Sequence, residues 1–193
     1  MRNDLRAFAV VLVLVAACGD AQHPTASSAP GLSTSVQSLH TGQVIDGVPC
    51  LPPDLPLVHN HIHLAILADG QPVTVPAGIG VGRPWGVDAT GFITGGSCFA
   101  WLHTHDTSGL VHMVSSRQTN FTLLNLFEVW GQPLGPNSAA GYRGDLAVFV
   151  NGERSSADPR SIPLINFRNI VIELGKPPSV QPPALYDFTK PRA

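Results

Sequence analysis

Charged side chains are scarce in this sequence, and lysine is the scarcest of the basic residues. Only 12% of the 193 residues are charged, and the formal net charge is −2 at pH 7. The two lysines, Lys176 and Lys190, both lie near the C-terminus. No cluster of basic residues therefore marks a surface for nucleic acid, and we expect no nucleic-acid partner.

Several familiar enzyme motifs are also missing. The sequence has neither an HExxH zinc-protease motif nor a GxSxG nucleophile elbow. His61 and His63 form an HxH that is followed by Pro76-Ala-Gly78, but this spacing is too short for a cupin, and no glutamate follows the HxH within the first few residues. Metal-dependent amidohydrolases carry an HxH on a barrel that this chain is too short to form. We therefore set these templates aside.

The N-terminus carries a short apolar run, Ala7 to Ala17, which follows two arginines and is too short to span a bilayer. It ends in Val15-Ala-Ala-Cys18, which resembles a bacterial lipobox. We expect residues 1–17 to be a lipoprotein signal peptide. Cys18 would then carry the lipid and anchor the protein to a membrane of the cell envelope, on its periplasmic or cell-surface face. An ordinary secretory signal is the alternative, and it also implies export.

Cysteine is rare as well. The sequence has three cysteines, and Cys50 and Cys98 remain as thiols once Cys18 is lipidated. An oxidising envelope favours a disulfide bond between them. Because each lies a few residues before one cluster of histidines, the bond would hold the two clusters together. Thiolate ligation of a metal is the alternative.

Histidine, in contrast, is abundant and clustered. Alternate residues of a β-strand point to one face, so each cluster can present several imidazoles together. Imidazole is the commonest protein ligand for zinc and copper. We predict a transition-metal site, for copper or zinc, and a polar or pH-responsive histidine cluster is the alternative. The predicted ligands are His59, His61, His63, His103, His105 and His112.

Asp106 is the acidic residue nearest to these histidines, and it begins the predicted turn Asp106–Gly109. It can ligate the metal, orient a liganding histidine, or simply accept hydrogen bonds from the backbone of the turn. We place it beside the metal as an orienting residue. If the turn closes with His105 opposite Leu110, the antiparallel register places His103 opposite His112.

The remaining pattern is mostly that of β-strands. Asp69-Gly70 between two apolar runs predicts a β-hairpin, and the Gly- and Pro-rich stretch 76–96 predicts a loop with at most one short strand. The predicted strands are 62–68, 71–75, 98–105, 110–114 and 146–150, and the stretches 162–164 and 169–174 supply one or two more.

One helix is clearly predicted, from Phe121 to Trp130, with Thr122 as its cap and Gly131 at its end. The order of elements predicts an α+β, β-rich single domain with a β-grasp-like sheet and one packed helix. A cupredoxin-like β-sandwich is the alternative fold. We expect a flexible tether over residues 18–45, and a histidine-rich domain with a proline-rich C-terminal tail over residues 46–193.

The motifs resemble those of a group of largely uncharacterised bacterial and archaeal envelope proteins. Their pattern runs HIHAHL, VPAGIG, WLHTHDxSGIIH and TLGxFFxxWG, and ends with VxVNG and a proline-rich tail. The resemblance covers about Cys50 to Phe188, and all six clustered histidines and Asp106 fall on matching positions. It implies a shared domain but brings no activity with it. The departures are Asn60, Ile62, Leu124 and Leu126, with conservative changes at Leu110 and Val111.

Taken together, the sequence favours a lipid-anchored envelope protein that binds copper or zinc for storage, sensing or delivery. A small metalloenzyme with a three-histidine site is one alternative, and a structural or pH-responsive interaction module without metal is another. An enzyme needs an acid or base positioned beside its metal, and Asp106 and Glu128 are the few candidates. The sequence indicates no particular protein partner.

Overall fold

The computed structural model describes residues 27–28, 35–53, 56–175 and 184–189. These residues form several β-sheets and one short α-helix, so the β-rich single-helix character predicted from the sequence is confirmed. Among the described residues, no helix is long and apolar enough to span a membrane. The predicted signal peptide, the lipidation site Cys18 and the part of the tether before residue 35 lie outside the described residues, apart from residues 27–28.

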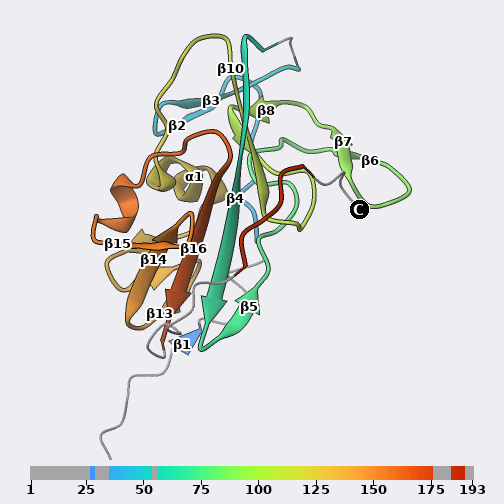
Figure 1. Cartoon of the computed structure of the whole chain (residues 1–193). Coiled ribbons are helices and arrows are strands. Elements are labelled where there is room, and N and C mark those ends of the chain that lie inside the picture. The colour runs from blue at the N-terminus through green and yellow to red at the C-terminus, as the bar shows by residue number, and fades with distance from the viewer. Residues whose placement is uncertain (1–26, 29–34, 54–55, 176–183, 190–193) are drawn as a thin grey trace, which may run out of the picture.

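The largest sheet has seven strands in the order β15-β14-β16-β4-β10-β9, with β5 paired to β4 (Figure 1). β16 runs parallel to β4, and all other neighbours in this sheet are antiparallel. Its strands are β4 (Val58–Ala68), β5 (Gln71–Val73), β9 (Leu102–His103), β10 (Leu110–Ser115), β14 (Leu146–Val150), β15 (Glu153–Ser155) and β16 (Arg168–Leu174).

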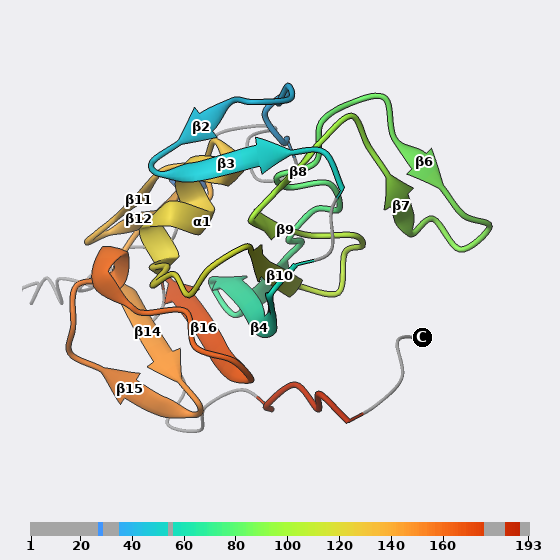
Figure 2. The ribbon, with the colours of Figure 1, turned by 90° about the horizontal axis from the view of Figure 1, so that it is seen from above.

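Three smaller sheets surround it. One joins β2 (Val44–Ile45), β3 (Val48–Leu51) and β8 (Phe99–Ala100). A second, β6 (Gly86–Val87) with β7 (Ile93–Gly95), forms an arm that projects from the body of the molecule (Figure 2). The third contains β1 (Ser27–Ser28), β11 (Leu134–Gly135), β12 (Ser138–Ala139) and β13 (Tyr142–Arg143).

The predicted helix is confirmed as α1 (Leu123–Trp130). Thr122 is its N-cap, and the side-chain oxygen of Asn125 accepts a hydrogen bond from the Thr122 backbone N–H at 2.7 Å. Gly131 ends the helix in the left-handed region, at φ 79°, where glycine meets no steric penalty. The side chains that α1 buries are Leu123, Leu126, Phe127, Val129 and Trp130.

The two faces of β4 have different surroundings because successive side chains of a strand point to opposite sides of a sheet. Ile62, Leu64 and Ile66 are at most 1% exposed and belong to the same buried cluster as the apolar side chains of α1. The alternate positions carry the first histidine cluster. The histidines of β4 therefore lie on the face of the sheet that is turned away from the hydrophobic core.

The predicted hairpin at Asp69-Gly70 is present, with β5 returning along β4. The predicted strand 98–105 is divided, because β8 pairs with β3 whereas β9 pairs with β10. Of the one or two strands predicted in 169–174 and 162–164, β16 covers the first stretch and no strand covers 162–164. This second stretch follows the 3₁₀ helix η1 (Pro159–Ser161) and pairs only through an isolated bridge to the residue before α1.

Residues 35–45, which the sequence places in the tether, contact the folded body. The indole N–H of Trp130 donates to the carbonyl of Ser35 at 2.9 Å, and Leu39 is 4% exposed within the core. Near the other end of the chain, the backbone N–H of Tyr186 donates to the side-chain oxygen of Asn169 on β16 at 2.8 Å. Segments on both sides of the predicted domain core thus pack onto it.

Candidate metal centre

Three adjacent strands carry histidines into one row. In the register of the main sheet, His112 of β10 lies opposite His61 of β4 on one side and opposite His103 of β9 on the other. The predicted pairing of His103 with His112 is therefore confirmed. Strand pairing alone thus places His61 of the first cluster on one side of His112 and His103 on the other.

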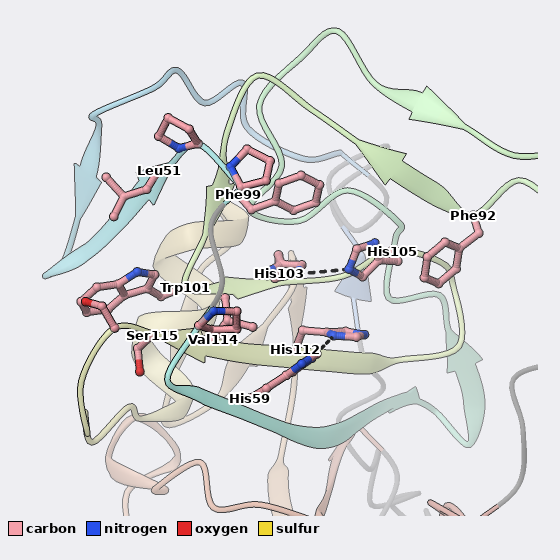
Figure 3. A pocket seen from close by; sticks show the side chains of 14 residues that line it. Leu51, His59, Phe92, Phe99, Trp101, His103, His105, His112, Val114 and Ser115 are labelled. Carbon is pink, nitrogen blue, oxygen red and sulfur yellow. Dashed lines mark hydrogen bonds between the residues drawn. The ribbon is translucent and has the colours of Figure 1, made fainter.

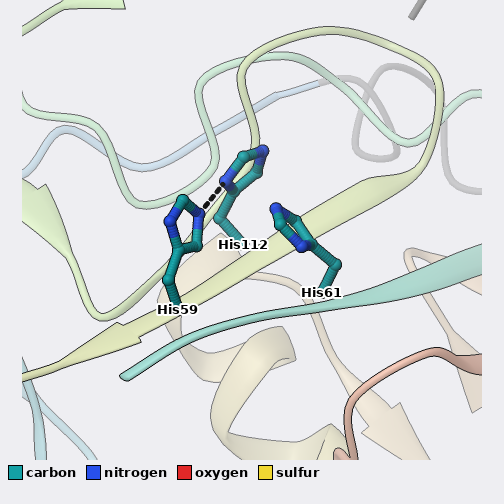
Figure 4. Close-up of side chains that lie close together, drawn as sticks. All are labelled: His59, His61 and His112. Atoms are coloured by element: carbon teal, nitrogen blue, oxygen red, sulfur yellow. Dashed lines mark hydrogen bonds between the residues drawn. The ribbon is translucent and has the colours of Figure 1, made fainter. Parts of the chain in front are cut away.

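The two clusters converge on a single patch, where two groups of three imidazoles could each hold a metal ion. In each group the ligand nitrogens all lie within 4.8 Å of one another, and His112 belongs to both groups. Figure 4 shows the first group, in which Nε2 of His59 lies 3.0 Å from Nδ1 of His112. The groups are His59, His61 and His112, and His103, His105 and His112.

Backbone carbonyls orient two of the three rings of the second group. Nδ1 of His103 lies 2.8 Å from the carbonyl oxygen of Ala100, and Nδ1 of His105 contacts the carbonyl oxygen of Ile93. A carbonyl oxygen can only accept a hydrogen bond, so both Nδ1 atoms carry a proton. When such a ring is neutral, its Nε2 holds a lone pair, as in metal-ligating histidines whose other nitrogen donates to a carbonyl.

These two Nε2 atoms face each other at 3.1 Å (Figure 3). Two lone pairs this close repel unless a proton or a metal cation lies between them. Two nitrogens at 2.0–2.1 Å from a tetrahedral ion would be roughly 3.3 Å apart, which is close to the spacing that the fold provides. The spacing therefore fits a shared metal ion, and it also fits a hydrogen bond in which one Nε2 carries a proton.

Burial keeps His103 neutral. Its side chain is 4% exposed, and burial, followed by the nearby His105, lowers its pKa to about 3 although the carbonyl of Ala100 acts in the opposite direction. A neutral imidazole is the form that ligates a metal. His103 is therefore ready to bind a cation at pH 7 without first losing a proton.

His63 is the one predicted ligand that the structure places in neither group. Its Nε2 lies 3.0 Å from the carbonyl oxygen of Ser108, and its ring stacks on Tyr186 with 4.4 Å between the centroids. Burial lowers its pKa from the ordinary value. These contacts give His63 a packing role between β4 and the C-terminal segment.

Asp106 acts within its own turn. Its carboxylate accepts hydrogen bonds from the backbone N–H of Ser108, at 2.9 Å, and from the Ser108 hydroxyl. It is in neither histidine group. Gly109 completes the turn at φ +82°, and a Cβ there would lie 2.3 Å from the carbonyl oxygen of Leu64. Glycine is thus required for the turn to approach β4.

The predicted disulfide between Cys50 and Cys98 is present, with Cα atoms 5.4 Å apart. The thiolate-ligand alternative is therefore wrong for this oxidised state. Cys50 lies on β3 and Cys98 directly precedes β8. The bond thus joins the segment that leads into β4 to the segment that leads into β9, as expected from its position before both clusters.

A cavity of about 440 Å³ opens onto the second group. Its walls include Phe92, Phe99 and Trp101, which the sequence did not identify as part of a site. Trp101 is spaced two residues from His103 and four from His105, and this alternation could have identified it as a neighbour of the site. Phe92 comes from a loop that contains no pattern typical of a site. Figure 3 shows these rings beside the imidazoles.

Comparisons with known protein families, with curated proteins and with solved structures find no match for this chain. A proposal for the function therefore rests on the geometry of the site.

Proposed function

We propose that this protein binds one copper or zinc ion through His103, His105 and His112, with His59 and His61 beside it. The observation that carries the proposal is the pair of Nε2 atoms 3.1 Å apart, each on a ring whose Nδ1 is directed to a backbone carbonyl. Two rings held in this way are preorganised to share a cation. His112 supplies the third nitrogen.

The choice of copper or zinc follows from the ligand set. Both groups contain nitrogen ligands alone among the described residues, and imidazole suits zinc and copper, whereas calcium and magnesium prefer oxygen. Two ions would both need His112, which would have to bridge them through its two ring nitrogens. One ion needs no such bridge, so we propose a stoichiometry of one.

Binding for storage, sensing or delivery is favoured over hydrolysis. The described residues that line the adjoining cavity include no Asp or Glu, and Asp106 is engaged by Ser108. Glu128 is an exposed residue of α1 and does not line the cavity. A carrier requires no acid or base at its metal, so the site has what a carrier needs.

The test is metal binding by single-histidine variants of protein purified without a metal-affinity tag. Loss of a partner that merely orients a ligand costs 10–100-fold in metal affinity, so loss of a ligand should cost at least about 100-fold. We expect this loss for His103→Ala and His112→Ala, measured by titration calorimetry with Zn²⁺ and by elemental analysis.

His63→Ala is the matched control, because His63 lies on β4 but in neither group. It should bind as the parent does. His61→Ala removes a ligand of the other group alone, so its effect relative to that of His103→Ala reports which group holds the ion. A parent protein that binds well below one equivalent, or a His112→Ala variant with parental affinity, would leave the histidines as a polar or pH-responsive cluster.

We also propose that the protein is a lipoprotein of the cell envelope, held to a membrane through Cys18. The lipobox-like sequence before Cys18 supports this, and the Cys50–Cys98 disulfide is typical of an exported protein. Cys18→Ala should move the protein from the membrane fraction to the soluble fraction and abolish incorporation of labelled palmitate. If the variant still sediments with membranes and incorporates label, Cys18 is not the anchor.

For the fold, we propose a β-grasp-like core made of β4, β10, α1, β14 and β16. The strand order β10-β4-β16-β14, with a parallel pair at its centre, supports this proposal. So does the position of α1 in the chain, between β10 and β14. An experimental structure with another order of these four strands would contradict the proposed β-grasp-like core.

A further inference from the structure

The cavity beside the metal centre changes in character from its base to its rim. At its base are His103 and His112, each 4% exposed, together with His105. Its rim includes Leu51, which is 40% exposed, and the exposed prolines that follow. A molecule that enters past the rim therefore meets imidazole nitrogens at the bottom.

Aromatic rings form the walls and touch the imidazoles directly. Phe92 stacks on His105 with 4.6 Å between centroids and an angle of 1° between the planes. Phe99 lies against both His103 and His105, at 5.2 and 5.7 Å. Figure 3 shows these side chains around one space, with Trp101 on another side. The ion proposed above would lie between this aromatic lining and the sheet.

The lining has an apolar body and few polar groups. None of the described lining residues is Asp, Glu, Lys or Arg, and the polar ones are the histidines and Ser115 and Ser116. A volume of about 440 Å³ lies within the range of about 300–1,000 Å³ typical of small-molecule pockets. Bare storage of an ion requires no such space.

We propose that the cavity binds a small organic molecule with an apolar, preferably aromatic, body and one oxygen- or nitrogen-containing group that ligates the metal ion through one or two atoms. This inference rests on the proposed function, because the donor needs an ion held by His103, His105 and His112. Three protein ligands leave a tetrahedral ion one open position, and such an ion can expand to five-coordinate, which accommodates a chelating group. All three of these histidines line the cavity, so that position can be filled from it.

The test compares two hydroxamates on protein loaded with Co²⁺, whose visible absorption reports its coordination. Benzohydroxamate and acetohydroxamate share one chelating group and differ in a phenyl or a methyl body. Burial of the additional apolar surface should make benzohydroxamate bind at least about tenfold more tightly. Titrations followed by the change in the cobalt spectrum give both dissociation constants, and gel filtration afterwards checks that the protein retains its cobalt.

Phe99→Ala removes one wall and should reduce the preference for benzohydroxamate over acetohydroxamate several-fold, as measured on the cobalt-loaded variant. Phe167→Ala is the matched control, because Phe167 is 58% exposed and does not line the cavity. Should Phe99→Ala fail to fold, the comparison of the two ligands on the parent protein decides by itself.

The possible failures are distinguishable. A protein that binds neither Co²⁺ nor Zn²⁺ overturns the proposed function, and this inference with it. If Zn²⁺ binds and Co²⁺ does not, the two hydroxamates are compared by calorimetry on the zinc-loaded protein. A protein that binds one equivalent of cobalt but binds both hydroxamates equally, or neither of them, keeps the metal site and overturns the aromatic-ligand proposal alone.

Discussion

Replacing both Cys50 and Cys98 by alanine is expected to lower the free energy of unfolding by about 4 kcal/mol in the chain-entropy account of cross-links. The disulfide joins residues 48 positions apart, so it removes many conformations from the unfolded chain. Both sulfurs belong to buried residues of the core, and alanine fills less of that space. The cavities left behind add to the loss.

Urea unfolding of the parent and the double variant, with a chelator present, measures this difference. Reduction of the parent protein is the internal control, because it breaks the same cross-link without removing the side-chain volume. It should reproduce most of the loss. A loss below about 1 kcal/mol in both experiments would mean that the unfolded chain is hardly restricted by the bond.

The disulfide also bears on the metal centre. Cys50 pairs across the strands with Ala100, whose carbonyl orients His103. The same bond holds β3, whose last residue, Leu51, lies at the cavity rim, and the chain continues from there to β4. We therefore expect the double variant to bind Zn²⁺ more weakly than the parent even where it is fully folded.

Much of the site could be predicted from the sequence because the residues that form each part of it are close together in the chain. Period-2 spacing predicts that His59 and His61 share a face, and the short turn Asp106–Gly109 fixes the register that sets His103 opposite His112. The helix was equally local, since its apolar spacing and its capping residues lie within one short segment.

The convergence of the two clusters was not readable, because it depends on pairing between strands that are distant in the sequence. β4 could pair with the strand that follows Asp69-Gly70 or with a strand beside the turn Asp106–Gly109. No pattern in a single sequence selects between these two pairings. The structure shows that β4 pairs with both β5 and β10. His63 then falls opposite Leu110, away from the shared patch.

The loop 76–96 was also beyond the sequence pattern. It was predicted to contain at most one short strand, yet it contains the paired strands β6 and β7. Ile93 of this arm provides the carbonyl that orients His105, and Phe92 covers the same ring. Backbone groups have no side-chain signature, so a carbonyl that fixes a tautomer cannot be recognised before the fold is known.

Replacing Phe127 or Trp130 of α1 by alanine is expected to lower the free energy of unfolding by about 3–5 kcal/mol, as for other large-to-small changes in a core. Both side chains are 0% exposed, and their rings contact each other at 5.4 Å between centroids. Trp130 also donates to the carbonyl of Ser35, so its loss removes one of the two side-chain donors to that carbonyl, the other being Gln132 at 3.4 Å. Phe127→Ala therefore tests packing alone.

The same variants separate stability from metal binding. The side chains of α1 pack on the core face of the sheet, whereas the histidines lie on its other face. The folded fraction of Phe127→Ala should thus bind Zn²⁺ within about threefold of the parent, because the carbonyls that orient His103 and His105 do not depend on this ring. The exposed Phe167 provides the control, since Phe167→Ala should change stability by less than about 0.5 kcal/mol. Calorimetry at a temperature where each variant is folded measures the affinity. A fall in metal affinity that parallels the loss of stability would show that the core beneath the sheet, and not the carbonyl contacts, sets the geometry of the centre.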